Sequence, residues 1–328
     1  MSGKRVLVTG ASGLLGRQVV QAFALDGWTV TGTAFSRADG KSLIKVDLGN
    51  AAEIEKVLND VKPNVVVHCA ANRFPDKVDK DPEGTRRLNV EASKTLAQQC
   101  AAQDAVLIYI STDYVFPGKP GEAPYEVDTT PAPPNLYGQT KLDGENAVLG
   151  VYSEARQAGA AAGTPKRGRA VVLRVPVLYG HAEKPAESAV NVLMDTVNKV
   201  QTPGVTATMD HWSIRYPTNT EDVGRVLKDI ANKYSEADLS ATLPPVVQFS
   251  SEDRFTKYEI CQLFAEVLGV RIDNLQPDPT GGNSGAPGAV QRPYDCHLST
   301  KALKDLGIKV HTQDFTAWWR RETKAFRH

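Results

Sequence analysis

The stretch RVLVTGASGLLG, residues 5–16, decides the fold of this chain. Its first five residues are an apolar, β-branched run typical of a buried strand. Three glycines follow at positions 10, 13 and 16, and an amphipathic helix is expected from Leu14 to Leu25. A strand that enters a helix through glycines in this spacing is typical of a dinucleotide site. The first glycine permits a tight turn, the second admits a pyrophosphate, and the third lets the helix pack on the strand. The residues expected to bind the cofactor are Gly10, Ser12, Gly13, Leu14, Leu15 and Gly16.

The rest of the first half alternates short apolar runs with helical stretches. Strands are expected at residues 29–33, 43–46, 64–68, 106–111 and 170–175, and further helices at 51–58, 83–102 and 135–149. Strands separated by helices of this length form parallel βαβ units. The sequence therefore predicts an α/β fold, a doubly wound parallel sheet of the Rossmann type.

The second half is less regular and is expected to form a smaller lobe for a substrate or partner. The domains are placed at residues 1–180, with an Ala/Gly-rich surface insertion at 151–169, and at 181–328. Helices are expected at 186–200 and 221–232, and a strand at 246–249 is expected to return to the main sheet. Thr256 and Glu259 form a capping-box pattern that opens a helix to Leu268. Residues 278–288 are expected to form a loop long enough to be a flap.

Composition excludes several classes of partner. Lys plus Arg and Asp plus Glu each number 38, so the formal net charge is zero, which is not typical of a protein that binds nucleic acid or a membrane surface. No apolar run approaches the roughly 20 residues that span a bilayer, and the start of the chain does not resemble a signal peptide. The four cysteines show no metal-ligand or disulfide pattern. We expect a cytoplasmic protein without a metal site.

The end of the second expected strand indicates which dinucleotide binds. An NAD site usually has an acidic residue there for the ribose hydroxyls, but this chain has Ser36 and Arg37, with Asp39 as the nearest acid. An arginine can bind a 2′-phosphate through paired hydrogen bonds, so NADP(H) is favoured over NAD(H). The alternative is an ordinary solvated arginine. Asp47 and Leu48, after the third expected strand, are candidate adenine contacts.

Three side chains suggest carbonyl reduction. Tyr137 and Lys141 lie one helical turn apart, and the strand at 106–111 brings Thr112 to the same sheet edge. Tyr137 would donate a proton to a carbonyl oxygen, Lys141 would lower the pKa of the phenol and bind the nicotinamide ribose, and Thr112 would hydrogen-bond the same oxygen. Such a Tyr/Lys pair also occurs by chance, and the alternative is a core tyrosine beside a surface lysine.

Together these motifs resemble the extended short-chain dehydrogenase/reductases over essentially the whole chain. ISTDYVF at 110–116 and NLYGQTKL at 135–142 are similar to dTDP-4-dehydrorhamnose reductase. Closer still is the similarity to the regulatory β subunits of methionine adenosyltransferase, which rests on VHCAA at 67–71, ESAV at 187–190, MDHW at 209–212, QRP at 291–293 and FRH at 326–328. This resemblance implies further cofactor contacts from Cys69, Ala70 and Ala71.

The resemblance leaves more than one function open. One is a regulatory subunit of methionine adenosyltransferase, needed for S-adenosylmethionine synthesis, which binds NADP(H) and a catalytic partner subunit. Another is a free-standing NADPH-dependent reductase of a 4-keto-6-deoxy nucleotide sugar, and a third is a redox-sensing protein that uses the dinucleotide only as a ligand. The intact Thr/Tyr/Lys set is compatible with all of them, and the flanking helices allow a homodimer without requiring one. Candidate substrate contacts are Asn191, Trp212, Arg215 and Arg292. The alternatives are a structural ion pair for Arg292 and a core indole for Trp212.

Overall fold

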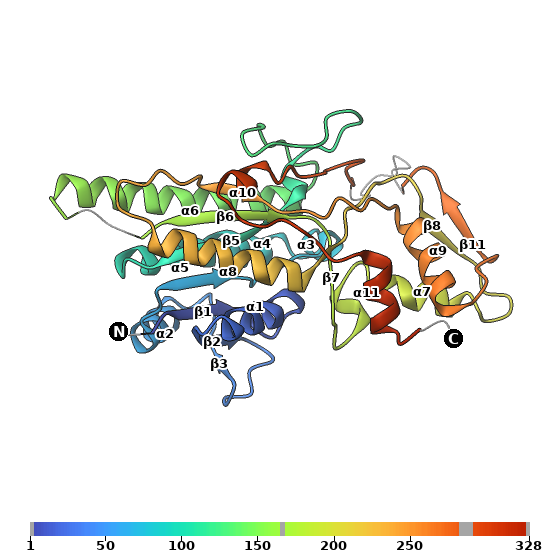
Figure 1. Ribbon diagram of the computed structural model, residues 1–328, viewed down its shortest axis with the longest axis horizontal. Helices are drawn as coiled ribbons and strands as arrows, with labels where there is room; N and C mark the ends of the chain where they lie inside the picture. The colour runs from blue at the N-terminus through green and yellow to red at the C-terminus, as the bar shows by residue number, and fades with distance from the viewer. Residues whose placement is uncertain (1–2, 165–167, 282–290, 326–328) are drawn as a thin grey trace.

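The computed structural model describes residues 3–164, 168–281 and 291–325. Its centre is a seven-stranded parallel sheet in the order β10-β6-β5-β4-β1-β2-β3 (Figure 1). The strands are β1 (Arg5–Thr9), β2 (Thr29–Ala34), β3 (Leu43–Lys45), β4 (Val65–His68), β5 (Val106–Thr112), β6 (Ala170–Val175) and β10 (Val246–Gln248). This is the predicted doubly wound α/β fold, and β10 lies where the strand at 246–249 was expected.

Two layers of helices cover the sheet. Because side chains alternate along a strand, Val6 and Val8 of β1 point to one apolar cluster and Leu7 points to the other. The first cluster also contains side chains of α1 (Leu14–Leu25), α8 (Thr220–Glu236) and α10 (Lys301–Asp305). The second contains side chains of α2 (Ala51–Val61), α5 (Ser93–Ala102) and α6 (Leu136–Ala161). The sheet is thus buried on both faces, which explains its continuous apolar strands.

The helix expected at 83–102 is interrupted by a turn of π-helix. It consists of α4 (Pro82–Arg86), a π-helical segment at Arg87–Ala92, and α5. Asn89 lies in the π segment, where its amide donates to the backbone oxygen of Asn72 at 3.0 Å and accepts from the Asn72 N–H at 2.9 Å. The π turn therefore holds the loop that follows β4, next to a short helix α3 (Pro75–Val78).

Two expected boundaries are wrong. Helix α6 continues to Ala161 instead of ending at Leu149, and Val151 and Tyr152 are buried in the second cluster rather than exposed in a surface insertion. The residues beyond Leu149 include strong helix formers, and the Tyr152 hydroxyl donates to the Ala105 oxygen at 2.8 Å. Residues 165–167 of the expected insertion lie outside the described residues.

The helix expected at 186–200 is also shorter in the structure. A 3-10 turn at Pro185–Glu187 is followed by irregular chain, and α7 covers only Leu193–Lys199. The Ser188 hydroxyl accepts from the N–H groups of Val190 and Asn191 at 3.0 and 3.1 Å. Such local side-chain bonds compete with the helix ladder, so the helix begins only after Val192.

The C-terminal lobe lies at the far end of the molecule from the N-terminus (Figure 1). It contains α7, α9 (Lys257–Leu268) and α11 (Phe315–Glu322), and two small parallel pairs, β8 (Ala207–Asp210) with β11 (Leu275–Asp278) and β7 (Leu178–Tyr179) with β9 (Thr218–Asn219). The expected capping box is present, because Thr256 and Glu259 exchange side-chain to backbone bonds at the start of α9. Most of the loop at 278–288 and the end of the chain at 326–328 lie outside the described residues.

The described part of the chain contains no helix that is both long and apolar enough to cross a membrane.

Candidate functional site

The glycine turn between β1 and α1 has the shape of a phosphate cradle. Gly10 has φ +65°, and a Cβ there would lie 2.9 Å from the Ala70 nitrogen. A Cβ on Gly16 would lie 2.2 Å from the Gly10 oxygen, so that position admits no side chain. Helix α1 begins after Gly13 with no side-chain cap and no acidic residue in its first turn. An open helix N-terminus of this kind favours an anion, so the residues present fit the diphosphate of a dinucleotide.

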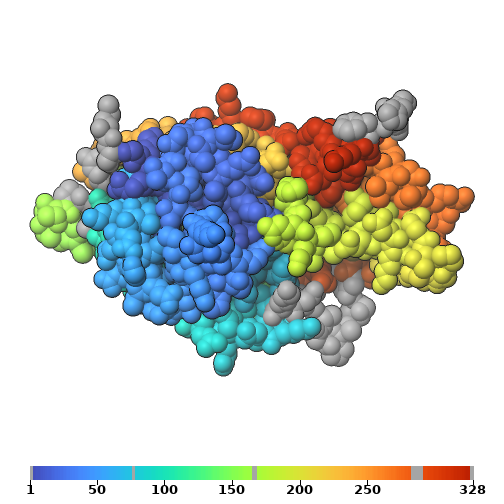
Figure 2. Space-filling view, turned by 90° about the horizontal axis from the view of Figure 1, so that it is seen from below, coloured from blue at the N-terminus to red at the C-terminus, as the bar shows by residue number. Residues whose placement is uncertain are grey.

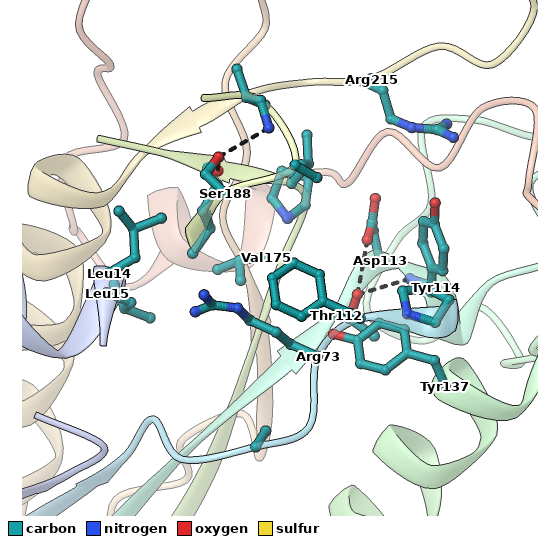
Figure 3. Close-up of a pocket in the computed structure, with 18 of the residues that line it drawn as sticks. Leu14, Leu15, Arg73, Thr112, Asp113, Tyr114, Tyr137, Val175, Ser188 and Arg215 are labelled. Carbon is teal, nitrogen blue, oxygen red and sulfur yellow. Dashed lines mark hydrogen bonds between the residues drawn. The ribbon is translucent and has the colours of Figure 1, made fainter. Parts of the chain in front are cut away.

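A cleft of about 270 Å³ extends from this turn along the carboxyl ends of the strands (Figure 3). Of the predicted site residues, it is lined by Leu14, Leu15, Cys69, Ala71, Thr112, Tyr137, Lys141, Arg215 and Arg292. The structure therefore brings together all three reductase-type residues, two residues at the start of α1 and two of the four candidate substrate contacts. This position matches the crevice in which open α/β sheets bind ligands.

Thr112 ends β5 and lies between an acid and a phenol. Its hydroxyl donates to Asp113 Oδ1 at 2.9 Å, and Tyr137 points toward it (Figure 3). Burial raises the pKa of Asp113 to about 6, although the Thr112 hydrogen bond acts in the opposite direction. Burial also raises the pKa of Tyr137 above its ordinary value of 10.0, with Thr112 again opposing. Tyr137 is therefore protonated at neutral pH and can only donate its proton.

Lys141 does not act on Tyr137 in the way that the sequence predicts. It is 3% exposed, donates to the Tyr109 hydroxyl at 2.8 Å and lies 4.0 Å from the centre of that ring. Burial lowers the pKa of Lys141 to about 7, with Glu145 opposing the shift. The expected lowering of the Tyr137 pKa is wrong, because the pKa of that phenol is raised. Room for the Tyr109 hydroxyl comes from Gly144, where a Cβ would lie 2.3 Å from it.

The buried lysine predicts a specific pH dependence of stability. Lys141 loses its proton near pH 7 when folded but near 10.5 when unfolded, so unfolding takes up a proton between these values. The free energy of unfolding should rise with pH in this window, by at most about 1.4 kcal/mol per unit. Lys141→Met should remove this rise. Urea titrations of both proteins at about pH 7, 8 and 9 measure the two slopes, and equal slopes would contradict the lowered pKa.

Eleven predicted site residues lie outside the lining of the cleft, and five of them belong to the glycine turn or contact it: Gly10, Ser12, Gly13, Gly16 and Ala70. The other six fall into two groups: Asp47, Leu48, Asn191 and Trp212 contact other parts of the protein, and Ser36 and Arg37 lie beyond the end of β2. Asp47 Oδ1 accepts from the Gly49 N–H at 2.8 Å, and Leu48 packs on the second apolar cluster. The Asn191 amide donates to the Gly180 oxygen at 2.8 Å, and the Trp212 ring lies 5.0 Å from that of Tyr294.

Arg37 pairs with protein carboxylates rather than standing free in solvent. Its guanidinium contacts Glu187 and, at 3.5 Å, Glu183. Two more predicted residues form hydrogen bonds at the glycine turn. The backbone oxygen of Ser12 accepts from Arg17 Nη1 at 2.7 Å, and the Ala70 N–H donates to Thr9 Oγ1 at 3.4 Å.

Arg215 is the predicted substrate contact that the structure places best. It is 7% exposed, and its Nη1 donates to the Ile214 oxygen at 2.9 Å. Its Nη2 is buried without a hydrogen-bond partner, 3.9 Å from Asp210 Oδ2. A buried donor without a hydrogen bond costs free energy, so this wall of the cleft suits a ligand group that accepts a hydrogen bond.

The prediction missed several residues at the cleft: Arg73, Asp113, Tyr114 and Glu187 line it, and Arg17 pairs with Glu187. Most of them are adjacent in sequence to a predicted site residue or follow a strand that ends at the ligand edge of the sheet. Arg17 follows Gly16 directly, Asp113 and Tyr114 follow Thr112, and Arg73 lies in the loop after β4 at the ligand edge of the sheet. Glu187 begins the ESAV stretch at 187–190 that contributes to the family resemblance, but no neighbouring predicted site residue marks it. Among the described residues, no group of three His, Cys, Asp or Glu side chains is placed to hold a metal ion.

Comparison with known proteins agrees with this architecture. The family model described as RmlD substrate binding domain matches residues 4–326. Methionine adenosyltransferase 2 subunit beta of Pongo abelii is 41% identical over 309 residues, which cover 94% of this chain and 84% of that protein.

Solved structures agree as well. A dTDP-4-dehydrorhamnose reductase from Clostridium acetobutylicum superposes with a TM-score of 0.76 at 22% identity, with 98% of each chain covered. The corresponding reductase from Bacillus anthracis, in complex with NADP, has a TM-score of 0.74 at 21% identity, also with 98% of each chain covered. The predicted resemblance to reductases and to regulatory β subunits is thereby confirmed.

Proposed function

This chain belongs to the RmlD substrate binding domain family, and from that premise we propose that it is an NADP(H)-binding regulatory subunit of a methionine adenosyltransferase. The observation that carries the proposal is the 41% identity to a methionine adenosyltransferase β subunit over 94% of the chain. A relationship of this extent covers the glycine turn, the cleft and the C-terminal lobe together. A cytoplasmic location is part of the proposal, supported by four cysteines that are all free.

The geometry of the cleft supports binding of the dinucleotide more directly than rapid turnover. The glycine turn and the N-terminus of α1 would hold the diphosphate, and Tyr137 would lie beside the nicotinamide. The raised pKa of Tyr137 makes it a weaker proton donor, and Lys141 is engaged with Tyr109. NADP rather than NAD is supported by the arginines near the turn and by the reductase structure that contains NADP.

The proposal is tested by complex formation with the catalytic subunit of a methionine adenosyltransferase from the same organism. Sedimentation velocity of the mixed proteins at about 10 µM each should show a complex, corresponding to a Kd of micromolar or tighter. A dTDP-4-dehydrorhamnose reductase of the same fold is the matched control and should not bind. If the two chains sediment separately with and without NADP⁺, the regulatory role is wrong.

A second candidate is an NADPH-dependent reductase of a 4-keto-6-deoxy nucleotide sugar. Three observations favour it: Thr112 and Tyr137 face one cleft, Arg215 Nη2 is a buried donor without a hydrogen bond in its wall, and the fold is that of such reductases. NADPH, when bound, supplies a hydride, while Tyr137 donates a proton to the carbonyl oxygen and Thr112 hydrogen-bonds that oxygen. Consumption of NADPH with dTDP- or UDP-linked 4-keto-6-deoxyglucose, in the presence of a 3,5-epimerase, tests it.

A further inference from the structure

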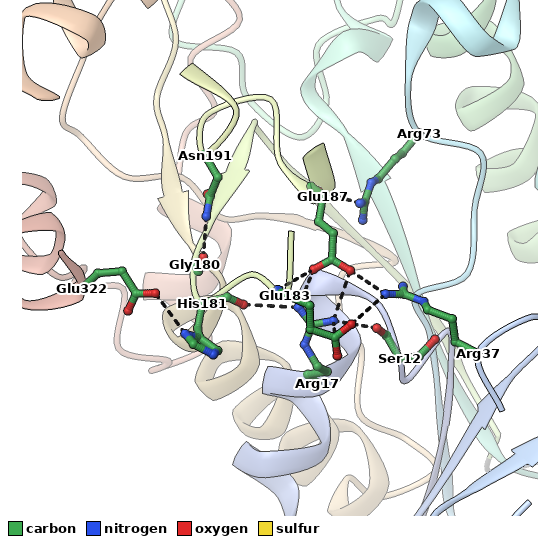
Figure 4. A network of polar contacts seen from close by, with 10 residues as sticks. All are labelled: Ser12, Arg17, Arg37, Arg73, Gly180, His181, Glu183, Glu187, Asn191 and Glu322. Carbon is green, nitrogen blue, oxygen red and sulfur yellow. Dashed lines mark hydrogen bonds and ion pairs between the residues drawn. The ribbon is translucent and has the colours of Figure 1, made fainter. Parts of the chain in front are cut away.

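Glu187 lies at the centre of a cluster of three arginines beside the glycine turn (Figure 4). Its Oε2 pairs with Arg17 Nη2 at 2.7 Å, and its Oε1 pairs with Arg37 Nη1. Its backbone oxygen accepts from Arg73 Nη2 at 2.6 Å. One carboxylate thus pairs with two guanidinium groups, while a third arginine binds the main chain of the same residue.

The two arginines that hold the carboxylate come from the two elements expected to bind phosphate. Arg17 follows Gly16 in the first turn of α1, and its Nη1 donates to the Ser12 oxygen at 2.7 Å. Arg37 follows the end of β2, where a 2′-phosphate is recognised in this type of fold. The carboxylate of Glu187 therefore lies between the helix N-terminus and the end of the second strand.

Residues 181–187, which we call the acidic strap, carry this carboxylate across from the C-terminal half of the chain. Figure 2 shows yellow-green surface of this part of the chain directly against the blue surface of the N-terminal residues. The strap is held at both ends: the His181 ring lies 3.0 Å from Glu322 of α11, and Arg73 binds the Glu187 main chain. The side chain can therefore leave the arginines while the strap stays attached.

The carboxylate is ionised and largely shielded from water. The Glu187 side chain is 12% exposed. Its burial alone would raise the pKa, but the hydrogen bonds from Arg17 and Arg37 outweigh that effect and hold the pKa at about 2. An anion with the same two partners must either displace this carboxylate or share the arginines with it.

We propose that Glu187 is a specificity-determining residue that competes with the 2′-phosphate of NADP(H) for Arg37 and Arg17. The inference rests on the proposed dinucleotide site. NADP(H) binding exchanges one anion for another at these arginines, and the displaced carboxylate remains close to the incoming phosphate. NAD(H) has no 2′-phosphate and gains nothing from displacing the carboxylate. Glu187 therefore weakens NADP(H) binding selectively and reduces the preference that Arg37 alone would produce.

Calorimetric titration with NADP⁺ and NAD⁺ tests this. Glu187→Gln keeps the size of the side chain and removes its charge, and it should tighten NADP⁺ binding by about five- to tenfold, with less than about twofold change for NAD⁺. Glu183→Gln is the matched control. That carboxylate is 58% exposed and contacts the same arginines at 3.5 Å, so the change should be below about twofold for both ligands. Arg37→Ala should remove the effect of Glu187→Gln.

The outcomes separate this inference from the proposed function. If no form of the protein binds either dinucleotide, the proposed cofactor site itself is wrong. If the wild type binds but Glu187→Gln leaves the NADP⁺ to NAD⁺ ratio unchanged, the competition is wrong. If Glu187→Gln weakens NADP⁺ binding while its circular dichroism spectrum and melting temperature match the wild type, the strap clamps the cofactor rather than competing with it, which also overturns the inference.

Discussion

Glu145→Leu is expected to lower the free energy of unfolding by about 3–5 kcal/mol. Glu145 of α6 and Arg174 of β6 are 2% and 4% exposed, and their guanidinium and carboxylate are paired twice, Nε to Oε1 at 3.0 Å and Nη2 to Oε2 at 2.7 Å. Removing the carboxylate leaves a buried cation, whose nearest remaining polar contact is Gln248 Oε1 at 3.5 Å. Because Glu145 lies one helical turn after Lys141, this pair also fixes the segment of α6 that faces the cleft.

A double-mutant cycle measures the effect. Chemical denaturation of Glu145→Leu, Arg174→Met and the double variant gives the three changes in unfolding free energy. Each single variant leaves one buried charge unpaired, whereas the double variant removes both charges and should recover most of the lost stability. A double variant that loses the sum of the two single losses would show that the residues do not interact.

Tyr137→Phe is expected to reduce the rate of any ketone reduction by this protein by about 100-fold or more. The substitution removes the only proton of the phenol that can reach the carbonyl oxygen, and general acid catalysis typically contributes about 10²–10⁴-fold. The ring remains in the cleft, so the affinity for NADPH should be unchanged. Steady-state NADPH oxidation with the keto sugar measures the first effect, and calorimetric titration with NADPH measures the second.

Tyr152→Phe is a suitable control for that experiment. Tyr152 lies on the same helix α6, but its hydroxyl donates to the Ala105 oxygen in the second apolar cluster, away from the cleft. The Tyr152→Phe variant lacks one hydroxyl, as Tyr137→Phe does. We expect it to have a lower free energy of unfolding and an unchanged rate of turnover. Unchanged turnover in Tyr137→Phe would remove this phenol from the mechanism.

Sequence patterns predicted the parts of the fold that depend on local chemistry. The apolar runs at 5–9 and 170–175 are strands because both faces of the sheet are buried, and the glycines at 10 and 16 occupy positions where a Cβ would collide with backbone. The capping box at Thr256 was predictable for the same reason, since its bonds join residues three positions apart. The position of Thr112 at the ligand edge of the sheet followed from the rule that parallel strands end at one edge.

Features that depend on contacts distant in sequence could not be predicted in this way. Lys141 turns to Tyr109 and Arg37 to Glu187, partners that lie 32 and 150 positions away. The extension of α6 beyond Leu149 depends on the buried position of Tyr152. The alanine-rich and charged sequence of this segment is equally compatible with an exposed loop. For such residues the sequence shows which types of side chain can act as partners. Which residue is the actual partner depends on the folded structure.

The strand order also affects how the protein is made. Strands β1 to β5 end at Thr112 and form the contiguous part β3-β2-β1-β4-β5 of the sheet. Because ribosomes add about 5–20 residues per second and domains fold as they emerge, this half and its glycine turn can assemble while the rest is still being translated. The edge of β5 stays unpaired until β6 emerges, and that of β6 until β10 follows. An unpaired edge can bond to another chain, so a ribosome that stalls between β6 and β10 leaves a nascent chain that is prone to aggregation.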